Sequence, residues 1–371
     1  MNRSPDQPNG RTHDARAATT GRLMSSHAPA YHRSMEGACR EIRLVAHPTG
    51  RPGEDLFEVA ETTIPDPTDG HLLIRNAYFS VDPYMRPRIG DARAYVAPYV
   101  LGEAMSGGAV GRVAVSRHPD FAEGDWVLHM LGWREWALSD GKHVWKVDPT
   151  VAPVSTALGV LGIPGFTAYH GLHEIGRPQP GETVFVSGAS GAVGSAAGQM
   201  ATIAGCRVLG CASSPEKVSW LRELGFDGVF DYREQPVRKA LADLAPEGLD
   251  LYFDNVGGEH LEAAIGAMRN HGRVVACGSM SRYGDTEPTA PLNLFMVVTK
   301  RLRMEGFLIS DHVDRFPEYV ATATQWVREG RLRYRETVID GIENAPAAFA
   351  GALRGESIGK MLVKVGPAEG S

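Results

Sequence analysis

The stretch that decides the fold is residues 184–232, which read VFVSGASGAVGSAAGQMATIAGCRVLGCASSPEKVSWLRELGFDGVFDY. It opens with a short apolar run at 184–186, which predicts a buried strand. Three glycines spaced three residues apart follow, and the small residues of 195–204 predict a helix packed closely on a sheet. A second strand is predicted to begin at Arg207. A strand, a glycine turn, a helix and a strand in this order form the unit that binds a dinucleotide pyrophosphate.

In such a unit, each of the three positions requires glycine for a different physical reason. At Gly188 the turn is too tight for a Cβ, at Gly191 the backbone must approach the phosphates, and at Gly194 the helix must lie close to the strand. The helix N-terminus then offers free N–H groups to the anion. The spacing is GxxGxxG rather than GxGxxG, so an ordinary glycine-rich turn is the alternative. The position between a predicted strand and a predicted helix favours the dinucleotide site, which comprises Gly188, Ala189, Gly191, Ala192, Val193 and Gly194.

The end of the second predicted strand indicates which dinucleotide is bound. An NAD site usually has an Asp or Glu there to hold the ribose 2′-hydroxyl, but residues 210–214 read GCASS. Ser213 and Lys217 suit a 2′-phosphate, which a carboxylate would repel. The cofactor is therefore predicted to be NADP(H). Lys217 is also explained as a solvated residue of a helix that begins at Ser214-Pro215, and both interpretations can hold together.

Composition excludes several classes of protein. The chain has 371 residues, 43% hydrophobic and 22% charged, with a net charge of −6, as in a soluble two-domain protein with no affinity for nucleic acid. It has no run of eighteen apolar residues, so no membrane span is predicted. Four cysteines without a CxxC pair predict buried thiols, no structural zinc, no disulfide framework and a cytoplasmic location.

Residues 1–38 are polar, rich in Pro, Gly, Ser and Arg, and without periodicity, so this extension is predicted to be disordered. Its arginines resemble those of a transit peptide, and translation from Met24 or Met35 is the alternative explanation.

The rest of the chain has two patterns of predicted secondary structure, one after the other. From residue 39 to about 150, short strand-like runs alternate with turns, which predicts a compact β domain. From 184 to about 330, strands alternate with helices, which predicts a doubly wound parallel sheet of the Rossmann type. A strand at 360–365 is expected to return to the first domain. The predicted fold class is α/β.

Several motifs in order resemble one known family. They are DPYMR at 82–86, MLGW at 130–133, GIPGFTAY at 162–169, the glycine turn, NVGG at 255–258 and GK at 359–360. From about residue 40 onward, the chain resembles the zinc-independent medium-chain dehydrogenases/reductases. Within them it is similar to the group of NADPH-dependent alkenal/one oxidoreductases that includes curcumin reductase, leukotriene B4 12-hydroxydehydrogenase and prostaglandin reductase.

The resemblance implies domains and cofactor contacts. A GroES-like, mainly β catalytic domain would comprise residues 39–158 and 336–371, and a Rossmann domain would comprise 159–335. Lys217 and Tyr232 would hold the 2′-phosphate end of NADPH. Ser357 stands where the family usually has Asn, and it is expected to keep a shorter or water-mediated contact. The residues expected on the nicotinamide side are Asn255, Cys277, Gly278, Ser279, Tyr283, Phe307, Leu308 and Ile309.

The resemblance also implies a reaction. Only Cys39 precedes residue 206 among the cysteines, so the catalytic zinc of other relatives is not expected. Without this Lewis acid, we expect reduction of an activated C=C bond in an enone or enal, in which an enolate develops. The proton for the α-carbon would come from water, a ribose hydroxyl or a phenol. Tyr283 is the first candidate for a hydrogen-bond donor to the enolate, and Tyr84 is the second, although either tyrosine could simply form part of the pocket.

Other interpretations remain open at this stage. A quinone reductase would use the same cofactor, and a non-catalytic NADPH-binding protein would need only the glycine turn. Arg86 and Arg88 are candidates for steering an acidic substrate tail or for a solvated face, and Trp133 for a pocket wall or the core. A predicted edge strand at 302–309 suggests a homodimer.

Overall fold

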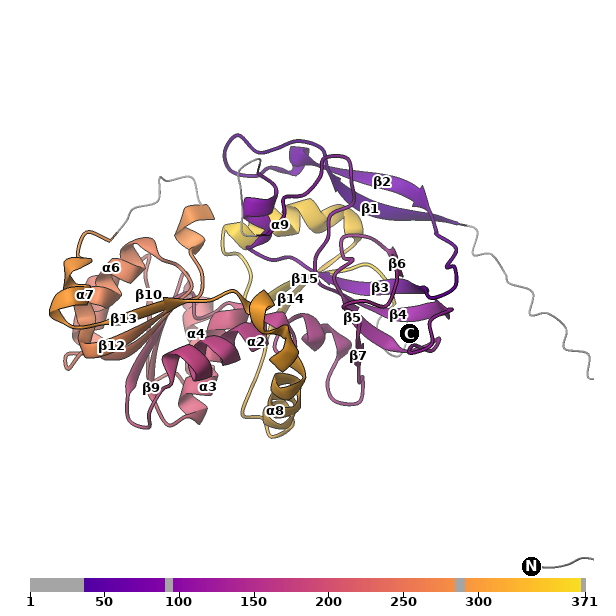
Figure 1. Ribbon diagram of the computed structural model, residues 1–371. Helices are drawn as coiled ribbons and strands as arrows, with labels where there is room; N and C mark the ends of the chain where they lie inside the picture. The colour runs from indigo at the N-terminus through magenta and orange to yellow at the C-terminus, as the bar shows by residue number, and fades with distance from the viewer. Residues whose placement is uncertain (1–36, 91–95, 284–290, 368–371) are drawn as a thin grey trace, which may run out of the picture. The chain divides into compact units, whose positions relative to one another are not determined.

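The structure is a computed structural model that describes residues 37–90, 96–283 and 291–367 (Figure 1). The extension predicted to be disordered lies outside the described residues except at its end, where the first strand begins at Ala38. In the described part of the chain, no helix has both the length and the apolar character needed to cross a membrane.

The strand before the glycine turn, β8, lies inside a parallel sheet of six strands. Its order is β10-β9-β8-β11-β12-β13, and every neighbouring pair is parallel. The strands are β8 (Thr183–Val186), β9 (Arg207–Ala212), β10 (Gly228–Asp231), β11 (Leu249–Asp254), β12 (Met268–Ala276) and β13 (Arg303–Gly306). The connecting helices are α3 (Ala192–Ile203), α4 (Pro215–Glu223), α5 (Val237–Leu244), α6 (Gly258–Ala267) and α7 (Phe295–Thr299).

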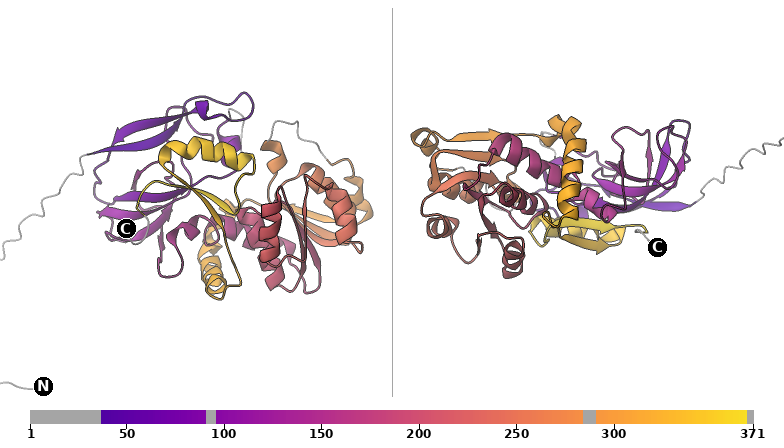
Figure 2. Two further views of the ribbon diagram at one scale, coloured as in Figure 1. Left: turned by 180° about the vertical axis from the view of Figure 1, so that it is seen from behind. Right: turned by 90° about the horizontal axis from the view of Figure 1, so that it is seen from below.

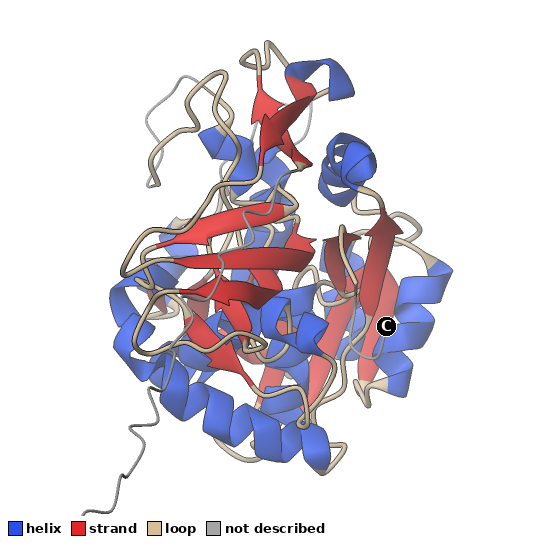
Figure 3. Ribbon diagram, turned by 90° about the vertical axis from the view of Figure 1, so that its right-hand side faces the viewer, coloured by secondary structure: helices blue, strands red, loops and turns tan. Residues whose placement is uncertain are grey.

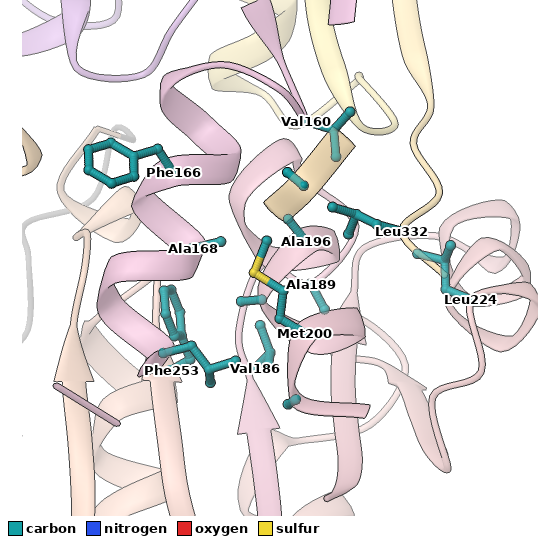
Figure 4. Packing of buried hydrophobic residues seen from close by; sticks show 14 of the residues in the cluster. Val160, Phe166, Ala168, Val186, Ala189, Ala196, Met200, Leu224, Phe253 and Leu332 are labelled. Atoms are coloured by element: carbon teal, nitrogen blue, oxygen red, sulfur yellow. The ribbon is translucent and has the colours of Figure 1, made fainter. Parts of the chain in front are cut away.

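Both faces of this sheet are buried, which explains why its strands are apolar runs rather than alternating patterns. Val184 and Val186 of β8 belong to one core cluster with α3 and with α2 (Ile163–His170), whose packing is shown in Figure 4. Phe185, between them, belongs to a second cluster with α5 and α6. The predicted doubly wound sheet is confirmed, and Figure 3 shows its strands flanked by helices.

The second sheet is mainly antiparallel. Its order is β14-β15-β3-β4-β5-β7, and β6 also pairs with β3. The strands are β3 (Leu72–Ser80), β4 (Ala109–Ser116), β5 (Trp126–His129), β6 (Trp136–Ser139), β7 (Trp145–Val147), β14 (Glu336–Asp340) and β15 (Lys360–Lys364). A separate hairpin joins β1 (Ala38–Leu44) to β2 (Phe57–Thr63). The mainly β N-terminal half is therefore confirmed.

The C-terminal strand returns to the N-terminal half, as predicted. Leu362 of β15 pairs with Ser80 of β3, and Figure 2 shows the yellow C-terminal segment beside the purple strands. Three further helices are α1 (Met85–Arg88), α8 (Phe316–Arg328) and α9 (Ala345–Leu353). Short 3₁₀ helices occur at Glu54–Leu56, Val154–Leu158, Met280–Tyr283 (η4), Ile309–Arg315 (η5) and Ile342–Asn344, and a π-helical turn occurs at Gly171–Gly176.

Two boundaries differ from the prediction. The strand expected at 302–309 is only β13, because its neighbour β12 ends at Ala276, which pairs with Gly306. The helix after the glycine turn begins three residues earlier than predicted, at Ala192. Gly194 therefore lies inside the first turn of α3.

Candidate functional site

The turn between β8 and α3 has the geometry that its glycines predict. Gly188 has a φ of +57°, in the left-handed region that favours glycine. A Cβ on Gly194 would lie 2.3 Å from the carbonyl oxygen of Gly188, so α3 packs on the turn at a distance that only glycine permits. A Cβ on Gly191 would contact only that same oxygen, at 3.4 Å. The backbone at Gly191 is therefore open to an approaching ligand.

Helix α3 directs its N-terminus into this turn. Gly191 caps it in an extended conformation, and the amides of Ala192 and Val193 lie in the first turn, ahead of the helical hydrogen-bond ladder. The amide of Gly359 donates to the carbonyl oxygen of Ser190 at 2.8 Å. The start of β15 therefore lies directly beside the turn. The arrangement provides backbone donors and a positive dipole end for a pyrophosphate.

A buried polar network holds the turn against the end of β11. The carboxylate of Asp254 accepts hydrogen bonds from the Tyr252 hydroxyl at 2.6 Å and from the Gly257 amide at 2.8 Å. It also accepts one from the hydroxyl of Ser187, which in turn accepts one from the Asn255 amide at 3.0 Å. Burial raises the pKa of Asp254, although these hydrogen bonds oppose the shift. The network fixes Asn255 next to the turn, where the side-chain amide donates to the carbonyl oxygen of Ser187 at 2.8 Å.

A cleft of about 420 Å³ lies beyond the end of β9. Ser214 caps α4 by accepting the Lys217 amide at 3.4 Å, so the helix interpretation of this segment is confirmed. The side chain of Lys217 is nevertheless buried rather than solvated, and its ammonium donates to the hydroxyl of Ser213 at 3.3 Å and to the carbonyl oxygen of Gly355. Burial lowers the pKa of Lys217, and the positive charge of Arg233 lowers it further. The strand end carries no carboxylate at 210–214, as the sequence predicts for a 2′-phosphate site.

The cleft contains residues that the sequence analysis did not identify. Its lining comprises Ser213, Ser214, Glu216, Lys217, Arg233, Arg354, Gly355, Glu356 and Ile358. Arg233 directly follows Tyr232, at the end of the third strand, and an arginine there was a usable signal for a phosphate site. Arg354 and Glu356 follow α9, far away in the sequence, and no local pattern indicates them.

Two predicted cofactor residues are not among those that line this cleft. The ring of Tyr232 packs edge-to-face against His260, with their centroids 5.0 Å apart, and the side chain is 37% exposed. Ser357 is half-buried between Glu356 and Ile358, which do line the cleft. Both residues lie at its border, and their cofactor contacts remain predictions.

The segment expected on the nicotinamide side packs against the end of β11. The amides of Cys277 and Gly278 donate to the carbonyl oxygen of Asp254 at 2.9 and 3.0 Å. Ser279 lies so close to Gly257 that a Cβ there would come within 2.9 Å of the serine hydroxyl oxygen. Burial raises the pKa of the Cys277 thiol to about 12, which makes it a poor nucleophile. The structure therefore brings Asn255 and residues 277–279 together.

The other segment predicted on the nicotinamide side comes after β13. The ring of Phe307 is half-buried and packs on His170 of α2, with centroids 5.2 Å apart. Leu308 is exposed, and Ile309 begins η5. Phe307 and Leu308 therefore form a loop after β13, and Ile309 starts a helical segment, where the sequence suggests a strand.

Tyr283 ends η4, which follows β12 after the segment 277–279 at the carboxyl end of the sheet. Its side chain is half-buried. Burial raises the pKa of Tyr283, and the charges of Arg282 and Arg86 oppose this shift. Burial likewise lowers the pKa of Arg86, and Tyr283 opposes that shift. The phenol from the parallel sheet therefore lies within the electrostatic influence of an arginine of α1 in the β half.

The other aromatic candidates have structural surroundings. Tyr84 precedes α1, and the guanidinium of Arg88 lies 5.9 Å from its ring centroid. Arg88 itself donates to the carbonyl oxygen of Ala97 at 2.8 Å and to the Tyr99 hydroxyl at 3.1 Å, so it does not face solvent freely. Trp133 is fully buried, and its indole N–H donates to the carbonyl oxygen of Ser80 at 3.1 Å. Of the two roles considered for Trp133, the core role is confirmed.

An ion pair joins two of the sequence motifs. Lys360, at the start of β15, is buried, and its ammonium lies 3.1 Å from the carboxylate of Asp82. The same ammonium donates to the carbonyl oxygens of Val81 and Met361, each at 2.8 Å. Asp82 immediately precedes Pro83-Tyr84 and α1. This pair therefore fixes α1 relative to the strand that lies beside the glycine turn.

The residues present fit NADP(H). The glycine turn is open where a phosphate must approach, and the cleft after β9 offers cations and hydroxyls. Across residues 37–90, 96–283 and 291–367, no three His, Cys, Asp or Glu side chains are grouped to hold a metal ion.

The chain matches two sequence families. Residues 40–147 match a family described as the N-terminal domain of oxidoreductase. Residues 192–325 match a family described as zinc-binding dehydrogenase.

Individual relatives match over most of their length. The chain is 40% identical over 329 residues to the NADPH-dependent curcumin reductase of Escherichia coli (strain K12), which covers 87% of this chain and 95% of the relative. It is 40% identical over 334 residues to the NADP(+)-dependent 2-alkenal reductase of Nicotiana tabacum, with 88% and 97% covered. The crystal structure of CurA in complex with NADPH from Vibrio vulnificus superposes with a TM-score of 0.84 at 40% identity, covering 88% of this chain and 99% of that one.

Proposed function

The chain belongs to the medium-chain dehydrogenase/reductase superfamily, and from this premise we propose that it reduces the C=C bond of α,β-unsaturated ketones and aldehydes with NADPH. One structural observation supports this assignment most. All three features lie at the carboxyl end of a single parallel sheet: the open glycine turn and the cationic cleft follow the adjacent strands β8 and β9, and the phenol of Tyr283 comes after β12, on the other side of β11. Such strand ends are where doubly wound sheets bind dinucleotides and their substrates.

NADPH would be held along this edge by the predicted residues. Residues 188–194 would bind the pyrophosphate through backbone amides, while Ser213 and Lys217 would lie at the 2′-phosphate, with Tyr232 and Ser357 at its border. Asn255 and the segments 277–279 and 307–309 would flank the nicotinamide. Bound NADPH would supply the hydride that the β-carbon of the substrate accepts.

The main contribution of the protein to the reaction is to stabilise the negative charge that develops on the substrate. As the β-carbon accepts a hydride, negative charge moves to the carbonyl oxygen, and a hydrogen-bond donor aimed at this oxygen stabilises the enolate. Tyr283 is our candidate for this donor. Because burial raises its pKa, the phenol stays protonated at neutral pH and can donate. Tyr84 is the second candidate, at the start of α1.

The test is NADPH consumption with a panel of enones, enals and quinones, with the product analysed for a saturated C=C bond. Tyr283→Phe removes one donor from the enolate, so we expect kcat to fall about 100-fold while KM for NADPH stays unchanged. Tyr84→Phe should have a smaller effect. Tyr169→Phe is the control, because this tyrosine packs on His173 and Tyr319, among aromatic residues of α2 and α8.

The possible outcomes of this test distinguish the proposed reductase from the alternative functions. Turnover that is unchanged in Tyr283→Phe removes Tyr283 from the mechanism. Turnover of quinones without enones would make the protein a quinone reductase instead. Tight NADPH binding without turnover of any acceptor would identify a binding protein and refute the proposed activity.

We also propose a division into two domains, with residues 39–158 and 336–371 forming the catalytic domain and 159–335 the NADP-binding domain. Sheet membership supports this division, since β3 to β7 share a sheet with β14 and β15 while β8 to β13 form the other. Limited proteolysis should cut near these boundaries. Protected fragments with other ends would require a different division.

A homodimer is proposed on the basis of the sheet edge. β13 is the last strand of the parallel sheet, and all four of its residues are exposed. Close to it in sequence, Leu292 is 91% exposed, Phe295 74% and Val298 66%, which is unusual for apolar side chains in water. Pairing of two β13 strands would extend the sheet and cover this surface. Sedimentation should give twice the monomer mass, and Phe295→Asp should shift it toward the monomer; a monomeric wild type would refute the proposal.

We place the protein in the cytoplasm. All four cysteines are free thiols, and Cys39, Cys206 and Cys211 are buried. A reducing compartment is the ordinary setting for such thiols. Cell fractionation with an antibody against the protein tests this location.

A further inference from the structure

Two stacked histidine rings join α2 to the chain that follows β13. His170 ends α2, His312 lies in η5, and their ring centroids are 3.9 Å apart with the ring planes inclined by 26°. His170 is only 5% exposed, and its ring also packs on Phe307. The same imidazole therefore contacts the chain before and after Leu308, and it holds the segment 307–309 against α2.

Two further contacts bring these parts of the chain close together. In the π-helical turn, the carboxylate of Glu174 forms an ion pair with Arg315 of η5 at 2.8 Å. A Cβ on Gly171 would lie 3.0 Å from the ring of Phe307, so the loop after β13 packs directly on the end of α2. Because the packing is this close, a change at the histidine stack must also displace the segment 307–309.

The surroundings of His170 favour its neutral form. Its Nδ1 is buried, and within residues 37–90, 96–283 and 291–367 it has no hydrogen-bond partner. A protonated imidazole carries an N–H on both nitrogens, so protonation would leave a buried donor without an acceptor. Burial lowers the pKa of His170, and His312 lowers it further.

Other charges around the stack act in both directions. The groups that act on the His170 ring are His312 and Arg315 of η5, Glu174 of the π-helical turn and Glu305 of β13. Arg315 also lowers the pKa of His170, whereas the two carboxylates oppose this shift. Each carboxylate is shared with an arginine, at 2.8 Å for Glu174 and 2.6 Å for Glu305. Next to His312 in sequence, Asp311 and Asp314 are exposed to water.

We propose that His170 and His312 position the nicotinamide side of the cofactor site, and that protonation of both rings separates η5 from α2 and displaces the segment 307–309. This inference rests on the proposed binding of NADPH beside residues 307–309. With no more than one ring charged, the stack is kept, but two like charges 3.9 Å apart repel each other. The stacked form binds fewer protons than the separated form, so cofactor affinity should fall as the pH drops.

The test compares two ligands that differ only in the nicotinamide ring. Binding of NADP+ and of 2′-phospho-ADP-ribose to the full chain is measured by calorimetry at about pH 7.5 and about pH 5.5, on either side of the ordinary histidine pKa. Both ligands carry the 2′-phosphate, which itself titrates near pH 6, so its effect cancels in the ratio of the two dissociation constants.

Three variants separate the stack from other histidines. His312→Phe and His170→Phe each keep a ring for stacking but remove one group that can be charged. His173→Phe is the matched control, because this histidine is close to the stack in sequence but its ring packs on Tyr169 and Trp326 rather than on η5. A second readout, which needs no ligand, is the titration of the His170 imidazole followed by NMR.

We expect the preference of the wild type for NADP+ over 2′-phospho-ADP-ribose to fall about 5- to 10-fold between the higher and the lower pH. In His312→Phe and in His170→Phe the fall should be less than about twofold, because the two rings can no longer both be charged. His173→Phe should show the fall of the wild type. The NMR titration midpoint of His170 should rise in His312→Phe, since the neighbouring charge is removed.

The results that would overturn the inference also show whether the proposed function survives. If the preference of the wild type does not change with pH, or changes equally in both stack variants, the stack is not the sensor, and the proposed function stands. If only His173→Phe flattens the pH dependence, the responsible group lies in the π-helical turn. If the wild type binds neither ligand, the proposed NADPH dependence fails together with this inference.

Discussion

Substituting alanine for each of two glycines in the β8–α3 turn should separate folding from cofactor binding. In Gly194→Ala, the new Cβ would lie 2.3 Å from the Gly188 carbonyl oxygen and 2.8 Å from the Cα of Ala189, both backbone atoms that cannot rotate away. Helix α3 and the turn must then separate by about 1 Å in a close-packed core. In Gly191→Ala, the Cβ would meet only the same oxygen at 3.4 Å, an ordinary contact.

The expected magnitudes follow from this difference. Overpacking at Gly194 costs about 1–3 kcal/mol, and the higher helix propensity of alanine returns up to about 1 kcal/mol. We therefore expect Gly194→Ala to lose about 1–2 kcal/mol of unfolding free energy. At Gly191 the loss of a preferred helix cap and the lower entropy of the unfolded chain nearly cancel, so the change should stay within about 0.5 kcal/mol.

Gly191→Ala, the variant with the smaller effect on stability, should nevertheless have weaker cofactor binding. The Gly191 methyl group would occupy the space where the backbone must approach the pyrophosphate, so NADPH should bind at least about tenfold more weakly although the fold is intact. Urea unfolding followed by circular dichroism gives the free energies, and titration of NADPH fluorescence gives the dissociation constants. The reasoning is refuted if Gly191→Ala keeps wild-type affinity, or if it destabilises the fold more than Gly194→Ala does.

Three further predictions concern buried polar groups. Asp82→Asn should cost about 3 kcal/mol of unfolding free energy, because it leaves the ammonium of Lys360 buried without its carboxylate, and urea unfolding measures this loss. Tyr252→Phe should cost about 1–2 kcal/mol, since Asp254 loses a hydrogen bond of 2.6 Å, and it should weaken NADPH binding because that network holds the turn. Burial lowers the pKa of His129 to about 3, so the unfolded chain takes up a proton below its ordinary pKa near 6.5 that the folded chain does not. Stability should therefore fall as the pH drops from 6.5 toward 3, by about 2 kcal/mol at pH 5, and thermal unfolding of His129→Gln should show a flatter pH profile.

Specific outcomes would contradict these predictions. Additive losses in the double variant Asp82→Asn/Lys360→Met would show that the ion pair contributes no coupling energy. Tyr252→Phe with unchanged stability would mean that the Asp254 carboxylate is satisfied by its other donors, the Ser187 hydroxyl and the backbone amides. A pH profile of His129→Gln as steep as that of the wild type would assign the acid sensitivity to other groups, such as His260, whose pKa burial lowers to about 4.

The sequence by itself determines the fold class and the type of cofactor, because both depend on local signals. Apolar runs, the small residues of α3 and the three glycines are read within a few turns of chain, and the positive φ of Gly188 confirms the glycine requirement. The absence of a carboxylate at 210–214 is equally local. The motifs that resemble the family lie in order along the chain, so they indicate the superfamily without any knowledge of contacts.

Only the tertiary structure decides which distant residues meet. The contact between Lys217 and Gly355 spans 138 residues, and the one between Lys360 and Val81 spans 279. Such contacts depend on strand order and on the return of β15 to β3, which no local pattern encodes. Arg354 and Glu356 were missed for this reason, whereas Arg233 directly follows Tyr232 and could have been identified from the sequence. Only the fold shows that Lys217, Arg233 and Arg354 line one cleft, although they come from three different parts of the chain.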